Sequence, residues 1–298
     1  MVRMTRHLPM LASLALLAAV PPALAESPDC EPAKEIDVAR LSARALIVGE
    51  LHGTTETPAF IARLACSLLK AGRPVIVALE REGQEQPALQ RYLSSAGQPA
   101  DVQALTGQEA WSRPQQDGRN SLAMLAMLEQ LRRLRAAGQP VGVLAMQQTF
   151  VPLVPPGTAG KATWSEADRD RFGEINDRTM ADQVWTTLAT HPAYTVIALA
   201  GNMHTAIASA SRLKQSPWPS FGDALAAMTP VQVIGLSSSG GSSWNMTSRG
   251  AGGHKTLGGP LYLPDSRVDL RVDLGVLSAS APAVTPGSAS AAADSAER

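Results

Sequence analysis

The stretch ALIVGELHG, residues 45–53, decides the fold class of this 298-residue chain. Residues 45–49 are a continuous apolar run, which is typical of a strand buried on both faces. The run is followed by a carboxylate, Glu50, and an imidazole, His52, and side chains two apart in an extended strand point to the same side. Gly53 then turns the chain toward a helix. The stretch therefore predicts a buried strand with two polar groups at its carboxyl end.

Working outward from this strand, further apolar runs alternate with segments of helical period. The runs lie at residues 74–79, 141–145, 194–200 and 231–236, and the helical segments at about 57–72, 121–138, 165–190 and 221–228. Such alternation predicts an α/β fold with a mainly parallel sheet and helices on both of its faces. Residues 84–120 are polar and predict a helical excursion that covers the site, and the Ser- and Gly-rich residues 237–259 predict loops.

The two ends of the chain differ from its middle in composition. Residues 1–25 carry two arginines, an apolar run over 8–20 and Ala-Leu-Ala at 23–25, which predicts a cleaved signal peptide and export to the periplasm or beyond. The apolar run is shorter than the roughly 20 residues of a spanning helix. Residues 26–276 are expected to form a single domain, and the Ala-, Ser- and Pro-rich residues 277–298 a disordered tail.

Composition limits the partners of the chain. Lys plus Arg and Asp plus Glu both total 26, so no charge excess favours nucleic acid, and the mature chain is expected to have no transmembrane span. The only cysteines are Cys30 and Cys66. In an exported protein they are compatible with one disulfide, but two free thiols remain an alternative.

Polar residues also follow two of the later strands. Glu80 ends the second run, and Asn202 and His204 follow the fourth. The carboxyl ends of parallel strands line one edge of a sheet, where ligands bind. The candidate catalytic residues are therefore Glu50, His52, Glu80 and His204, with Glu82 as an alternative to Glu80.

The chemistry of this set allows two kinds of site. A carboxylate can orient an imidazole that removes a proton from water, while another polar group stabilises the oxyanion. Alternatively, His52, His204 and Glu50 could bind a divalent metal. The usual short signatures of zinc proteases, serine hydrolases and nucleotide-binding proteins are absent from the sequence.

Four motifs in order carry a family resemblance. Gly49-Glu50-Leu51-His52, Glu80, Asn-Asp-Arg-Thr-Met-Ala at 176–181 and Ala-Gly-Asn-Met-His at 200–204 resemble the superfamily of ChaN-like haem-binding lipoproteins, TIKI/TraB proteins and erythromycin esterases. The motif order, the Asp-Arg-x-Met-Ala segment and the predicted export make the ChaN-like branch the most similar.

The resemblance implies different activities for each branch. Esterase-like members activate water with Glu and His without an obligatory metal, TIKI proteins resemble metal-dependent proteases, and ChaN-like proteins are associated with haem or iron uptake. On this basis Asn176, Arg178 and Asn202 are expected to bind substrate. Two functions are therefore predicted: an exported hydrolase of small-molecule or peptide substrates, or a haem- or metal-binding protein that uses the same cleft.

Overall fold

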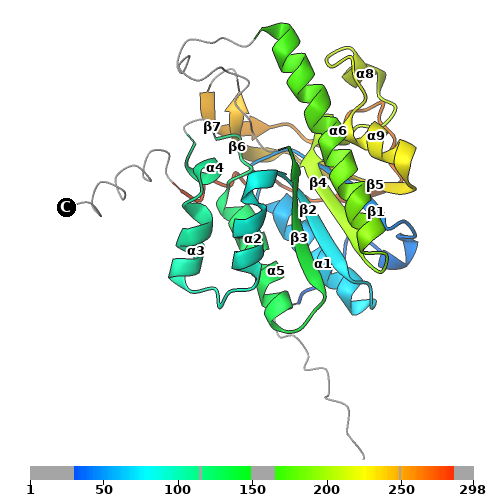
Figure 1. The fold of residues 1–298 in the computed structure, drawn as a ribbon. Coiled ribbons are helices and arrows are strands. Elements are labelled where there is room, and N and C mark those ends of the chain that lie inside the picture. The colour runs from blue at the N-terminus through cyan, green and yellow to red at the C-terminus, as the bar shows by residue number, and fades with distance from the viewer. Residues whose placement is uncertain (1–29, 114–115, 149–164, 248–249, 285–298) are drawn as a thin grey trace, which may run out of the picture.

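A computed structural model shows the fold and describes residues 30–113, 116–148, 165–247 and 250–284 (Figure 1). The predicted signal peptide lies outside the described residues, as do residues 285–298 of the predicted tail.

The core is a sheet in which five strands run parallel in the order β3-β2-β4-β1-β5. A parallel β9 and a short antiparallel β8 also pair with β5. This arrangement confirms the predicted α/β fold with a mainly parallel sheet. The strands are β1 (Ala45–Glu50), β2 (Val75–Glu82), β3 (Val141–Gln147), β4 (Thr195–Gly201), β5 (Val231–Ser238), β8 (Gly259–Pro260) and β9 (Leu270–Asp273).

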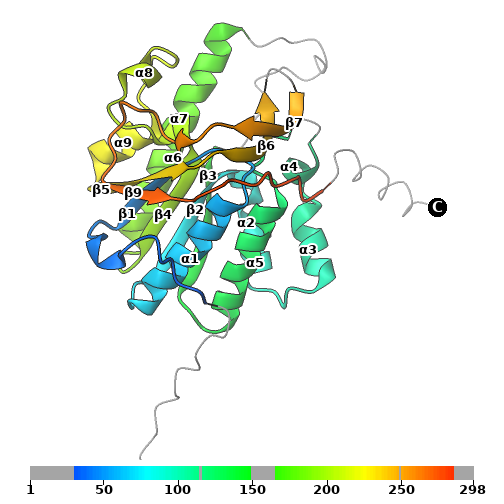
Figure 2. The same cartoon turned by 180° about the vertical axis from the view of Figure 1, so that it is seen from behind.

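Helices cover both faces of the sheet, because alternate side chains of each strand point to opposite faces. Leu46 and Val48 of β1 pack into the core under α1 (Glu56–Lys70) and α5 (Leu122–Ala136), which Figure 2 shows in front. Ile47 packs into the core under α6 (Glu166–Thr190) and α9 (Phe221–Met228) on the other face. Serine side chains cap the amino termini of α5, α6 and α9 by accepting a backbone hydrogen bond.

The excursion after β2 contains short helices, as predicted, and it returns to the sheet through residues 116–120. Its helices are η2 (Gly83–Glu85), α2 (Gln86–Leu93), α3 (Pro99–Thr106) and α4 (Glu109–Ser112). Three further short helices lie elsewhere in the chain: η1 (Val38–Arg40), α7 (Asn202–Thr205) and α8 (Ala210–Leu213).

The prediction of loops over residues 237–259 is wrong for much of this region. β6 (Gly241–Thr247) and β7 (Gly250–Thr256) form an antiparallel hairpin, which Figure 2 shows at the same end of the sheet as α7. Glycine and serine have low strand propensity, so the sequence gives little indication of strands here. The hairpin is stabilised by backbone pairing and by packing of the Trp244 ring close to Gly252.

The predicted start of the tail at Leu277 is also wrong. Leu277 is buried, Ala279 pairs with Thr54, and Pro282 pairs with Ser121. The composition argument fails here because backbone bridges and one leucine side chain hold the segment against the domain. The folded chain therefore continues to at least Val284.

Two further expectations concern the disulfide and the membrane. Cys30 and Cys66 form a disulfide with an S–S distance of 1.97 Å, which ties the start of the described chain to α1. Of the helices that the structure describes, none combines the length and apolarity needed to cross a bilayer.

Candidate functional site

The site lies at the carboxyl edge of three neighbouring strands. β4 runs between β1 and β2, so Glu50 at the end of β1 pairs with Gly201 at the end of β4. On the other side of β4, Glu80 of β2 accepts a hydrogen bond of 2.7 Å from the backbone N–H of Gly201. The strand order therefore brings both predicted carboxylates to the same place.

The two predicted histidines face Glu80 from opposite sides. His52 Nδ1 lies 3.0 Å from Glu50 Oε1, and its Nε2 lies 3.5 Å from Glu80 Oε2. His204 Nε2 lies 3.7 Å from the other oxygen of Glu80. The four residues predicted to be catalytic are thus assembled in one cluster, which we call the Glu80 cluster.

A fifth member of the cluster, Asp177, was not predicted. Its Oδ1 lies 2.6 Å from His204 Nδ1, so each histidine has a carboxylate at Nδ1 and Glu80 at Nε2. Asp177 is fully buried, and its carboxylate also accepts hydrogen bonds from three other donors. These donors are the Phe221 backbone N–H at 3.1 Å, Arg212 Nη2 at 2.7 Å and Trp218 Nε1 at 2.8 Å. Asp177 is therefore a fixed acceptor that orients the His204 ring.

The returning excursion supplies a cation that the sequence also did not predict. Arg119 Nη1 lies 3.0 Å from Glu80 Oε1, and its Nη2 lies 2.6 Å from Asp117. The Gln147 amide at the end of β3 donates a further hydrogen bond of 3.2 Å to Glu80 Oε1. Glu80 is thus held by donors from β3, β4 and the excursion.

The charges in the cluster shift the pKa values of its members. Burial alone would lower the pKa of His52, but the carboxylates of Glu50 and Glu80 outweigh it and raise this pKa to about 9. Burial alone would also lower the pKa of His204, but the carboxylates of Glu80 and Asp177 outweigh it and raise this pKa. Burial would raise the pKa of Glu80, but His204, Arg119 and His52 hold it below the ordinary value. At neutral pH, Glu80 is therefore ionised and His52 is a cation.

The loop that carries His52 is clamped by segments remote in sequence. Gly53 has a φ of +74°, and a Cβ there would meet the Trp244 carbonyl oxygen at 1.6 Å. The Gly53 carbonyl accepts hydrogen bonds from the N–H groups of Trp244 and Ser280, at 2.8 and 2.9 Å. The hairpin and the segment after Leu277 therefore fix the position of His52.

The three predicted substrate-binding residues have different positions. Arg178 is exposed and lines a hollow between α6 and α9 on the outer side of α6, away from the Glu80 cluster, so its role in substrate binding stays a prediction. Asn202 donates a hydrogen bond of 3.0 Å to the Leu261 carbonyl, which links α7 to the segment after β8. Asn176 is buried beside Asp177 and its Oδ1 has no hydrogen-bond partner, so its role in substrate binding stays a prediction.

Glu82, the alternative to Glu80, is bound elsewhere. Its carboxylate pairs with Arg113, with one oxygen 2.8 Å from Arg113 Nη2. Arg81 next to it pairs with Glu85 and stacks on the Trp111 ring at 4.3 Å. Glu80 is therefore the residue of this segment that faces the histidines.

The donor set fits a divalent metal or a haem poorly. Among the residues that the structure describes, no three His, Cys, Asp or Glu side chains are grouped so as to hold a metal ion. The Glu80 oxygens already accept hydrogen bonds from Gly201, Gln147 and Arg119, and the guanidinium charge would repel a cation. The cavity beside Glu80 and Arg119 has a volume of about 50 Å³, whereas sites that enclose drug-sized ligands have roughly 300–1,000 Å³.

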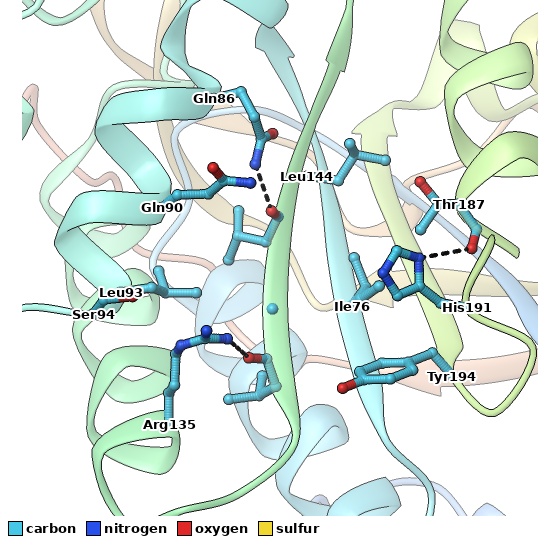
Figure 3. A pocket seen from close by; sticks show the side chains of 13 residues that line it. Ile76, Gln86, Gln90, Leu93, Ser94, Arg135, Leu144, Thr187, His191 and Tyr194 are labelled. Carbon is cyan, nitrogen blue, oxygen red and sulfur yellow. Dashed lines mark hydrogen bonds between the residues drawn. The ribbon is translucent and has the colours of Figure 1, made fainter.

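A larger groove lies away from the cluster, along the outer edge of β3 (Figure 3). The Gln86 side chain pairs with this edge by donating to the Val143 carbonyl and accepting from the Ala145 N–H, at 3.0 and 2.6 Å. His191 lies at the far side of the groove, where its Nδ1 is 3.3 Å from the Thr187 carbonyl and caps the end of α6. The groove therefore contains none of the predicted site residues.

Comparisons with solved structures identify the same fold in other proteins. A Bacillus cereus protein aligns with a TM-score of 0.53 and 15% identity, covering 74% of this chain and 73% of that one. A mutant of erythromycin esterase EreC in its open conformation aligns with a TM-score of 0.53 and 13% identity, covering 74% and 78%. A succinoglycan biosynthesis protein aligns at 0.50 and 13%, covering 74% and 73%.

These likenesses confirm the predicted fold, which this chain shares with an erythromycin esterase. No family model matches the sequence. No curated protein matches it either.

Proposed function

We propose that this protein is an exported hydrolase that activates a water molecule at the Glu80 cluster. The observation that carries the proposal is the arrangement of two imidazoles around Glu80. Each imidazole has Nδ1 on a buried carboxylate and turns Nε2 toward a Glu80 oxygen, at 3.5 and 3.7 Å. Such an arrangement fixes the ring orientation that general-base catalysis requires.

We assign the general base to His204. Asp177 accepts the Nδ1–H, so the neutral ring has a free lone pair on Nε2 with which to take a proton from water. The positive charge of His52 opposes the protonation of His204 that Glu80 and Asp177 favour. The resulting hydroxide attacks the carbonyl carbon, and the imidazolium then gives its proton to the leaving group.

His52 is assigned to the developing oxyanion. Its pKa of about 9 keeps it cationic at neutral pH, and a fixed cation beside a developing negative charge lowers the barrier. Glu80 remains ionised and holds the cationic His52 ring by charge. The rate should therefore depend on pH through both rings, rising as His204 loses its proton and falling as His52 loses its own.

The substrate class is an ester or lactone of a small molecule. This class is supported by the shared fold with an erythromycin esterase. Peptides form the comparison class in the test. The expected metal independence follows from the poor fit of the donor set.

The proposal is tested by hydrolysis of a panel of nitrophenyl esters, lactones and short peptides by the purified protein. His204→Gln should lower kcat/KM for esters by about 10²- to 10⁴-fold, the usual contribution of a general base. His191→Gln is the matched control, because His191 caps α6 in the groove away from the cluster. The activity should survive chelator treatment. No hydrolysis by the wild type, or equal rates for His204→Gln and wild type, would refute the proposal.

Export is part of the same proposal. It rests on the leader pattern of residues 1–25 and is supported by the Cys30–Cys66 disulfide, since disulfides persist in oxidising compartments. Amino-terminal sequencing of the exported protein should begin at Glu26. Recovery only of a cytoplasmic chain that still carries its leader would contradict this.

A further inference from the structure

Helix α6 has apolar residues on both of its faces. The inner face packs Met180, Val184 and Leu188 into the core against the sheet. On the outer face, Ile175 is 40% exposed and Trp185 is 44% exposed. In Figure 1, α6 crosses the outside of the sheet with its outer face toward the viewer. Two large apolar side chains are therefore presented to solvent by a helix that already has a buried face.

These residues belong to one regular stripe. Ile175, Arg178, Asp182 and Trp185 are all exposed and follow one another at spacings of three, four and three residues. This is the spacing of the contact positions in a coiled coil, which keeps side chains on one line of a helix. We call these four residues the α6 stripe.

The α6 stripe is complementary to itself in the antiparallel direction. If two copies of α6 cross as antiparallel neighbours centred on residue 180, Ile175 of each copy faces Trp185 of the other. The same register places Arg178 of each copy opposite Asp182 of the other. A two-fold axis thus creates two apolar pairs and two ion pairs, as an isologous interface requires. A parallel arrangement would instead oppose like charges.

We propose that the α6 stripe is the interface of a two-fold symmetric homodimer of this protein. The charges are available for it, because neither Arg178 nor Asp182 takes part in an ion pair with a residue that the structure describes. A hollow of about 530 Å³ flanks the stripe, and its lining includes Arg178, Asp182, the acidic Glu174 and Asp223, and the apolar Met228 of α9.

The test reverses one charge at a time and measures mass in solution by light scattering during gel filtration. The wild type should be a dimer. In Arg178→Asp, the new acid faces Asp182 of the other copy, and in Asp182→Arg, the new base faces Arg178 of the other copy. Like charges then repel at both contacts, so each variant alone should be a monomer. Mixing the two variants should restore a dimer, because every crossing in the mixed pair joins opposite charges.

Arg91→Asp is the matched control, since Arg91 is an exposed helical arginine on α2, outside the stripe. It should leave the dimer intact, and circular dichroism should show that all the variants are folded. A monomeric wild type, a dimer insensitive to both reversals, or a mixture that remains monomeric would overturn the proposal. These results are independent of ester hydrolysis, so failure of the dimer and failure of the proposed function are distinguishable.

Discussion

Replacing Asp177 by asparagine should weaken both the fold and the catalytic base, by amounts that the structure allows us to estimate. The carboxylate accepts from His204 and Phe221 on one oxygen and from Arg212 and Trp218 on the other. An asparagine amide has only one oxygen, so its NH₂ must face two donors whichever way it turns. Arg212 is only 2% exposed, and breaking a buried ion pair costs about 3 to 5 kcal/mol.

The effect on the rate follows from the same geometry. If the amide oxygen remains on the Arg212 side, His204 loses the acceptor that holds its proton on Nδ1. The proton then moves to Nε2, and the ring can no longer accept one from water. We expect kcat/KM of the folded variant to fall about 10²- to 10⁴-fold, as for the loss of a general base.

The assays are urea unfolding and ester hydrolysis per folded molecule. Trp218→Phe is the matched control, because it removes one donor from Asp177 without changing the partner of His204, and it should cost about 1 kcal/mol. Its rate should stay within a few-fold of the wild type. If Asp177→Asn retained the wild-type rate per folded molecule, the assignment of His204 as an oriented base would be refuted.

Three further predictions concern the space beside His52 at Gly201, the positive charge of His52 and the Cys30–Cys66 disulfide. A Cβ on Gly201 would lie 3.0 Å from His52 Nε2. Gly201→Ala should therefore displace the ring and lower kcat/KM at least about tenfold, with little change in stability. The control is Gly142→Ala on β3, whose Cβ would meet only Ile76 at an ordinary 3.5 Å, and this variant should have the wild-type rate. The raised pKa of His52 stabilises the fold fully below its unfolded value of about 6.5, and this stability is lost as the pH rises through 9. Urea titrations should therefore show a falling free energy of unfolding over that interval, and His52→Ala should make the fall smaller, leaving the part that comes from the raised pKa of His204. Replacing Cys30 and Cys66 by serine should lower the free energy of unfolding by about 4 kcal/mol, given their separation of 36 residues, whereas an unchanged urea midpoint would contradict this.

The helical spacing of the sequence indicates Asp177 as a buried residue, although the family motif indicates its neighbours Asn176 and Arg178 instead. Asp177 lies on α6 at helical spacing from Ala181, Val184 and Leu188, all of which are buried against the sheet. Arg178 is rotated by about 100° from this face and is exposed, as helix geometry requires. Helical phase would therefore have selected Asp177 and rejected Arg178 as a member of the site.

Asp117 and Arg119 carried no such signal. They lie in a polar segment without period, and their position depends on a contact between Gly118 and Gly53, two glycines that approach closely. Such a contact joins parts of the chain that are far apart in sequence. Short-range patterns predict strands, helices and strand ends, but they contain no information on which loops will touch.

The strand order explains why the predicted strand ends form a site at all. β1 and β2 are consecutive in sequence, yet β4 lies between them, so Glu50 and Glu80 come from strands about 9 to 10 Å apart. At this separation, the two carboxylates can contact the two opposite nitrogens of the His52 ring. The end of the intervening strand is Gly201, which has no side chain, and a Cβ there would meet both His52 and Glu80. The space in which the imidazoles face Glu80 therefore arises because β4, which ends in glycine, lies between β1, which ends at Glu50, and β2, which carries Glu80 near its end.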